Sequence, residues 1–126
     1  MSDQVHLRIP ATTGHIGLAR ATATALAARL DFTYDRLMDL HIAIDEVCGR
    51  VLATSDPPVR SLRLTFDVVD DGLRITVAGE SPVKAGAEFL NPWSKLILES
   101  VASELQVGRD GEPIDVRFMV NRGELR

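Results

Sequence analysis

Residues 39–50 read Asp39-Leu40-His41-Ile42-Ala43-Ile44-Asp45-Glu46-Val47-Cys48-Gly49-Arg50 and indicate a buried helix that carries two adjacent carboxylates. Its apolar residues recur every three or four positions, which is the spacing of a buried helix face. Glu46 and Arg50 are four residues apart, so they share one face of that helix. We predict a helix that begins at Asp35 and ends at residues 55–58. Its buried positions are predicted to be Leu37, Leu40, Ile44, Val47, Cys48 and Val51.

A strand and a helix are predicted before this segment. Residues 5–9 alternate between apolar and polar side chains, which is the period of a half-buried strand. Thr12 or Thr13 then caps an alanine-rich helix that runs to Leu30. A polar stripe lies beside the apolar face of this helix, and we expect its Arg20 to be accessible. The stripe consists of Thr13, Gly17, Arg20 and Thr24.

Two hairpins and a third helix are predicted after it. Residues 62–68 and 73–77 alternate on either side of the turn Asp70-Asp71-Gly72, which indicates a hairpin. Residues 79–90 hold no period and are expected to be irregular. Asn91-Pro92 opens a helix whose apolar positions continue to Leu105. A second hairpin is predicted over residues 105–107 and 114–120, with its turn at 109–111.

The order of elements predicts an α+β fold. A strand, two helices, a hairpin, a loop, a helix and a hairpin give a mostly antiparallel sheet with its helices on one face. A chain of 126 residues, 45% of them hydrophobic, is long enough for one core, so we predict a single domain over residues 1–126.

Charge and composition argue against several classes of function. The net charge is −4, and the 14 basic residues are scattered, so we expect neither direct DNA binding nor attachment to an anionic membrane. There is no apolar leader and no run of 18 apolar residues, which indicates a cytoplasmic protein. The three histidines show no ligand spacing, so no metal site is expected. The lone Cys48 is expected to be a small buried residue.

Three segments resemble the RsbW and SpoIIAB anti-sigma factors, which belong to the GHKL ATPase superfamily. They are Leu18-Ala19-Arg20-Ala21, Leu30-Asp31-Phe32-Thr33 and Asp45-Glu46-Val47-Cys48-Gly49-Arg50. The last segment is most similar to the actinobacterial, UsfX-like branch. The resemblance implies a two-layer α/β sandwich of GHKL type. It also implies that active members use ATP and Mg²⁺ to phosphorylate a serine.

The same resemblance assigns roles to the second helix. Glu46 matches the glutamate that helps to activate the attacking serine hydroxyl, whereas Arg50 stands where active members have an Mg²⁺-binding asparagine. A guanidinium has no acceptor atom and repels a cation, so Arg50 cannot ligate Mg²⁺. Arg50 could instead neutralise a phosphate or pair with Glu46. We therefore expect Glu46 to be a structural carboxylate, paired with Arg50 or capping a nearby amide, and not a catalytic residue.

Two other parts of the nucleotide site are altered as well. Gly79 stands where active members have the aspartate that binds adenine, and Ser81 replaces a flexible glycine after it. Pro92-Trp93-Ser94 replaces a Gly-x-Gly whose amides would approach the phosphates, and proline lacks that amide. We therefore predict no bound ATP or Mg²⁺ and no working kinase. Trp93 would then either anchor a partner protein or fill the vacated pocket.

The resemblance also implies the partners. The chain is expected to inhibit an alternative sigma factor of the stress or developmental type and to be antagonised by an anti-anti-sigma protein with a STAS domain. Arg20 matches an arginine that contacts both partners, and it lies on the polar stripe. A homodimer is the habit of the family, and the amphipathic first strand and the sheet edge are the candidate interface. The alternatives are an active ATP-dependent serine kinase and a stand-alone interaction domain.

Overall fold

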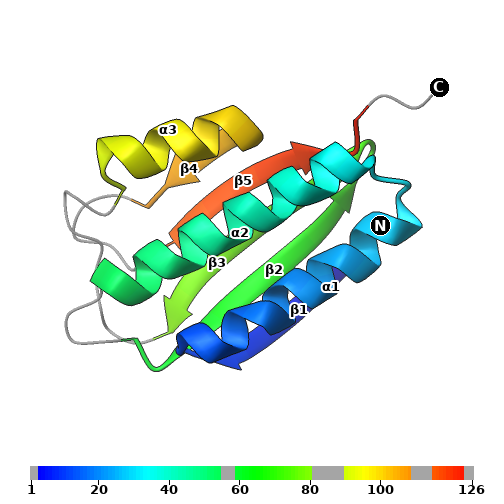
Figure 1. Ribbon diagram of the computed structural model, residues 1–126. Coiled ribbons are helices and arrows are strands. Elements are labelled where there is room, and N and C mark those ends of the chain that lie inside the picture. Colours follow the sequence, from blue (N-terminus) through cyan, green and yellow to red (C-terminus); the bar gives the residue numbers. More distant parts are fainter. Residues whose placement is uncertain (1–2, 55–58, 81–89, 109–114, 124–126) are drawn as a thin grey trace.

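A computed structural model describes residues 3–54, 59–80, 90–108 and 115–123. It contains five strands, three α-helices and one 3-10 helix among these residues (Figure 1). In chain order they are β1 (Gln4–Pro10), the 3-10 helix η1 (Thr13–His15), α1 (Ile16–Arg29), α2 (Tyr34–Thr54), β2 (Ser61–Val69), β3 (Gly72–Glu80), α3 (Pro92–Val101), β4 (Ser103–Val107) and β5 (Asp115–Asn121).

The strands form one sheet in the order β1-β2-β3-β5-β4, and every neighbouring pair is antiparallel. Figure 1 shows the three α-helices side by side over one face of this sheet. The predicted α+β sandwich with an antiparallel sheet is therefore confirmed. Of the helices in the described part of the chain, none combines the length and the apolar composition that a membrane crossing requires.

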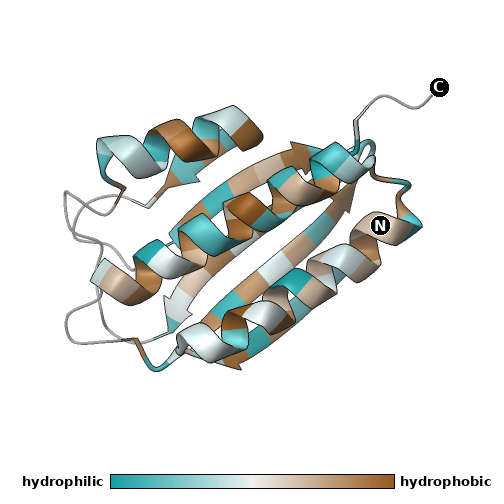
Figure 2. Ribbon diagram, in the orientation of Figure 1, coloured by the Kyte–Doolittle hydropathy of each residue, from teal (hydrophilic) through white to brown (hydrophobic). Residues whose placement is uncertain are grey.

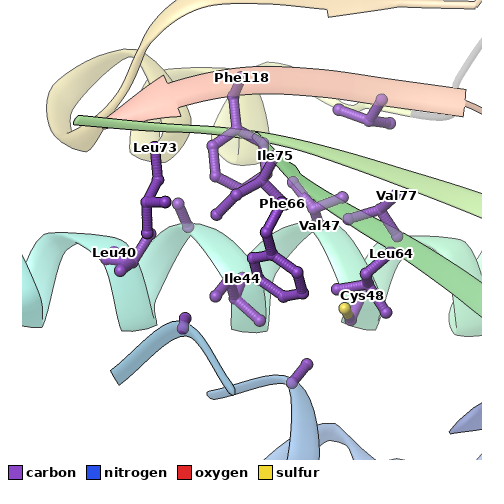
Figure 3. Packing of buried hydrophobic residues seen from close by; sticks show 14 of the residues in the cluster. Leu40, Ile44, Val47, Cys48, Leu64, Phe66, Leu73, Ile75, Val77 and Phe118 are labelled. Carbon is purple, nitrogen blue, oxygen red and sulfur yellow. The ribbon is translucent and has the colours of Figure 1, made fainter. Parts of the chain in front are cut away.

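The core lies between α2 and the middle strands. Figure 3 shows side chains of α2, such as Ile44 and Val47, facing Phe66, Ile75 and Phe118 of the strands. All five are fully buried. A buried side chain of this size stabilises the fold by about 1.5–3 kcal/mol through removal of apolar surface from water. All the predicted buried positions of the second helix are in this core except Leu37, which is partly buried against it.

The first hairpin forms as its alternation predicts. Leu64 faces Val77 in the register of β2 and β3, and apolar and polar residues alternate along both strands (Figure 2). The turn lies at Asp70 and Asp71. Gly72 then begins β3 so close to β5 that a Cβ atom would lie 2.3 Å from the Val120 carbonyl oxygen. Only glycine fits there.

The link between α1 and α2 consists of a C-cap motif that ends α1 and a side-chain cap that begins α2. Asp31 adopts a left-handed conformation with φ 58°. The amides of Asp31 and Phe32 donate to the carbonyls of Ala28 and Ala27 at 3.5 and 3.1 Å, which is the pattern of a Schellman motif. Thr33 Oγ1 then accepts a hydrogen bond from an amide in the first turn of α2 at 3.3 Å. The link is therefore a defined turn.

The predicted cap of the first helix is wrong. Thr12 and Thr13 precede a 3-10 turn, and α1 begins after it, with His15 at the N-cap and no side-chain cap. The Thr12 hydroxyl instead lies 2.7 Å from His15 Nδ1. The short turn separates both threonines from the amides that they were expected to cap.

Two predicted boundaries are also wrong. Gly79 belongs to β3, and α3 ends at Val101, so that Leu105 lies in β4. The change from helix to strand is abrupt because Ala102 is already extended, with φ −135° and ψ 166°. Glu104 then adopts φ 53° at a bulge in the pairing of β4 with β5. Predictions for residues 55–58, 81–89 and 109–114 lie outside the described residues.

Candidate functional site

The carboxylate of Glu46 connects α2 to α3. Its Oε2 accepts a hydrogen bond from Ser94 Oγ at 3.1 Å, and Ser94 is only 2% exposed. The backbone amide of Ser94 donates to the Asn91 side chain at 2.8 Å, which confirms Asn91 as the N-cap of α3. Ser94 as the partner of Glu46 was not predicted from the sequence. The carboxylate therefore holds the first turn of α3 against α2.

The position matched to the adenine-binding aspartate is covered by apolar side chains. Gly79 lies in β3, where a Cβ atom would be 2.7 Å from Val59 Cγ1 and 3.5 Å from Val51 Cγ1. Both valines are buried. An aspartate at this position would require Val59 to move, and its carboxylate would enter an apolar environment.

The residues at the other matched positions also do not fit Mg²⁺ and ATP. Arg50 is half-buried on α2, and its guanidinium offers no lone pair to a metal. Pro92 is exposed at the first position of α3 and carries no N–H for a phosphate. Ser81 lies outside the described residues. In the described part of the chain, no three His, Cys, Asp or Glu side chains gather as a metal site.

Trp93 is 69% exposed, so the prediction that it fills a vacated pocket is wrong. The helix α3 turns a different face inward: Ser94, Leu98 and Val101 are buried, whereas Leu96 is 61% exposed. The hydrogen bond of Ser94 to Glu46 lies on this inward face. Trp93 therefore remains a candidate anchor for a partner.

The predicted polar stripe lies along the seam between α1 and α2. Arg20 Nη1 donates to Asp45 Oδ1 at 2.6 Å, and the two side chains are 41% and 51% exposed. Thr24 Oγ1 donates to the Arg20 carbonyl at 2.9 Å and lies 2.7 Å from His41 Nε2. Since the hydroxyl has one hydrogen, His41 donates from Nε2 in this arrangement. The seam thus contains two polar pairs, one turn apart.

The other two residues of the polar stripe, Gly17 and Thr13, lie on the N-terminal side of Arg20. Gly17 is half-buried on α1, and a Cβ atom there would be 3.5 Å from Arg20 Nη2, so the guanidinium lies against a helix position without a side chain. Thr13 is exposed in η1. Asp45 and His41 were missed as partners, although their spacing of four residues matches that of Arg20 and Thr24 on the facing helix.

Cys48 lies in the core below this seam and is fully buried. Burial, together with the nearby negative charge of Asp45, raises the pKa of its thiol from 9.0 to about 12. The thiolate is the reactive form of cysteine, so this thiol is inert at neutral pH.

Comparisons with known proteins agree with this fold. The chain is 32% identical over 80 residues to the serine-protein kinase RsbW of Bacillus velezensis and 31% identical over 81 residues to that of Bacillus subtilis. These matches cover 62% and 63% of the chain, and the chain spans about half the length of either relative. No protein-family model matches the chain.

A solved structure shares the fold. The crystal structure of the RsbU and RsbW domains of Rv1364c from Mycobacterium tuberculosis matches 98% of this chain and 33% of that chain, with a TM-score of 0.73 and 15% sequence identity. The resemblance to the RsbW-type anti-sigma factors with a GHKL fold, first drawn from three segments of the sequence, is therefore confirmed both in sequence similarity and in fold.

Proposed function

We propose that this protein is an anti-sigma factor without a working kinase site. It binds and inhibits an alternative sigma factor of the stress or developmental class, and an anti-anti-sigma protein with a STAS domain antagonises it. The observation that carries the loss of the kinase is the contact between Glu46 and Ser94. The carboxylate that would activate a serine of the antagonist already accepts a hydrogen bond from a buried hydroxyl of the same chain.

Three other residues support the absence of ATP and Mg²⁺. Arg50 brings a positive charge to the position of the metal ligand, Gly79 offers no carboxylate to adenine, and Pro92 offers no amide to a phosphate. Each objection is independent of the others. Restoring one of these residues alone would therefore not restore the site.

Arg20 supports the binding of partners. Its side chain is 41% exposed, and its Nη1 donates a hydrogen bond to Asp45. Arginine has five N–H donors in a planar fork, so donors remain for a carboxylate of a partner. Thr13, Gly17 and Thr24 extend the partner surface on both sides of Arg20.

Further parts of the proposal rest on the resemblance and on composition. The protein acts as a single domain over residues 1–126 in the cytoplasm, makes no direct contact with DNA and forms a homodimer. The scattered basic residues and the negative net charge support the absence of DNA binding.

The test is calorimetric titration of the purified protein, first with ATP and Mg²⁺ and then with the alternative sigma factors and STAS-domain proteins of the same organism. We expect no heat with nucleotide and tight binding of one sigma factor. Arg20→Glu should weaken that binding by several kcal/mol, because charge reversal in a desolvated pair has this effect. Arg29→Glu is the matched control, since Arg29 is exposed at the other end of the same helix.

An active serine kinase is the second candidate, because the relatives that match about three fifths of the chain are named serine-protein kinases. It predicts phosphate transfer to the antagonist. It also predicts stabilisation by about 2.7 kcal/mol when ATP is present at roughly one hundred times its dissociation constant. A stand-alone interaction domain would bind the STAS protein and no sigma factor.

A further inference from the structure

A hollow of about 310 Å³ lies where the second half of α1 meets the beginning of α2. It continues the seam that contains Arg20, because Thr24 belongs to both. Its lining is mostly apolar. The lining residues are Thr24, Ala27, Ala28, Phe32, Tyr34 and Leu37.

The walls of this hollow are fixed by backbone hydrogen bonds. The left-handed turn at Asp31 brings the Phe32 amide to the Ala27 carbonyl at 3.1 Å, so Phe32 is held over the end of α1. The amide of Thr33 donates to the Arg122 carbonyl at 2.9 Å, which anchors the start of α2 to the segment after β5. A site that is already ordered costs little entropy to occupy.

An aromatic side chain stands beside the hollow without being buried. Tyr34 is 73% exposed, although Phe32 and Leu37 next to it are partly buried against the core. Tyrosine is among the residues that most often carry binding energy at protein interfaces, because it combines a large apolar surface with a hydroxyl. This combination indicates a contact site for a protein.

We propose that the hollow receives one apolar side chain of the protein segment that contacts Arg20. The identity of that partner rests on the proposed function. The guanidinium of Arg20 lies against Gly17. Gly17 precedes Thr24 by seven residues and Ala28 by eleven, which is roughly 10–17 Å along the helix. The segment therefore carries a carboxylate for Arg20 and an aliphatic or aromatic side chain roughly 10–17 Å away. That separation corresponds to about three to five residues of extended chain.

A display library of random short peptides, selected on the full chain, tests the hollow without a known partner. We expect selected peptides to pair an acidic residue with an apolar one at this separation. Ala28→Gln places a longer neutral side chain in the hollow and should weaken their binding by about tenfold or more, as the loss of an interface anchor does. Arg20→Ala should weaken the same peptides.

The matched control is Ala25→Gln, because Ala25 is exposed on the same helix and does not line the hollow. Both variants are first compared with the wild type in urea denaturation. The proposal is overturned if no peptides are selected, or if Ala28→Gln binds them as Ala25→Gln does. It is also overturned if sedimentation shows that Ala28→Gln turns a dimer into monomers, since a second copy then covers the hollow.

The two proposals fail in different ways. If a sigma factor binds the wild type and Ala28→Gln equally well, only the role of the hollow is wrong. If no sigma factor or STAS protein binds, but the selected peptides respond to Arg20→Ala and Ala28→Gln, only the proposed function is wrong.

Discussion

The Ser94 hydroxyl donates a hydrogen bond to the Glu46 carboxylate over 3.1 Å and so joins α3 to a helix 48 residues earlier in the chain. One side of this contact is a carboxylate on α2, and the other is a hydroxyl in the first turn of α3. The contact therefore holds two helices together.

Ser94→Ala should lower the free energy of unfolding by about 1–2 kcal/mol, because it removes the donor of a partly buried hydrogen bond to a charged group. Urea denaturation measures the change. Ser100→Ala is the control, since the exposed Ser100 hydroxyl donates to the Ile97 carbonyl of its own helix, and it should change stability by less than about 0.5 kcal/mol. Equal losses in the two variants would show that the contact to Glu46 contributes nothing.

The pair of Arg20 and Asp45 should contribute little to stability despite its short distance, because both side chains are about half exposed. A double-mutant cycle with alanine at each position should give a coupling of about 0.2–1 kcal/mol, which falls further in about 1 M salt. A coupling well above this range would mean that the pair holds the seam together and is not free to meet a partner.

The buried thiol of Cys48 should make the free energy of unfolding fall at alkaline pH. Folding raises the pKa of its thiol from 9.0 to about 12, so the folded state favours the protonated form. This contribution to stability is complete below pH 9 and is lost between pH 9 and 12, at about 1.4 kcal/mol for each pH unit. Cys48→Ala should be less stable at pH 7 but should lose less stability between pH 9 and 11.

The same burial should protect the thiol from reagents. Iodoacetamide at pH 8 should leave native Cys48 unmodified and should react with it once urea unfolds the chain. Rapid modification of the folded protein would contradict this expectation and would mean that the thiol is accessible to reagents in the native state.

Asp31→Gly should stabilise the protein by roughly 0.5–1 kcal/mol, because Asp31 adopts φ 58°, a conformation that favours glycine. Arg29→Gly is the control, since Arg29 is the last residue of α1, and it should cost about 0.5–1 kcal/mol. Thermal denaturation compares the two variants. Equal destabilisation would mean that the Asp31 side chain makes a contribution larger than the strain of its backbone.

Elements with a regular apolar period were predictable from the sequence. The helix around Ile44 and the hairpin around Leu64 and Val77 each have one buried face, and burial of that face fixes both the type of element and its register. The short helix after Asn91 was placed correctly at its start, because the Asn91 cap is a local signal.

Features that depend on distant parts of the chain were not predictable in the same way. Trp93 and Leu96 are apolar but exposed, because α3 turns its other face toward α2, where Ser94 contacts Glu46. The chemistry of the candidate site was predictable from single residues such as Arg50, because a guanidinium cannot ligate a metal. The contacts between site residues were not predictable, since the partner of Arg20 lies 25 residues away on the facing helix.

The two ends of the sheet are not equivalent as templates for a further strand. At one end, β1 pairs with β2 in unbroken register over all seven of its residues, from Gln4 to Pro10. At the other end, the bulge at Glu104 bends β4 and interrupts its pairing. A strand added beside β1 would therefore meet a regular edge, whereas a strand added beside β4 would meet a bulge, which disfavours edge-to-edge pairing.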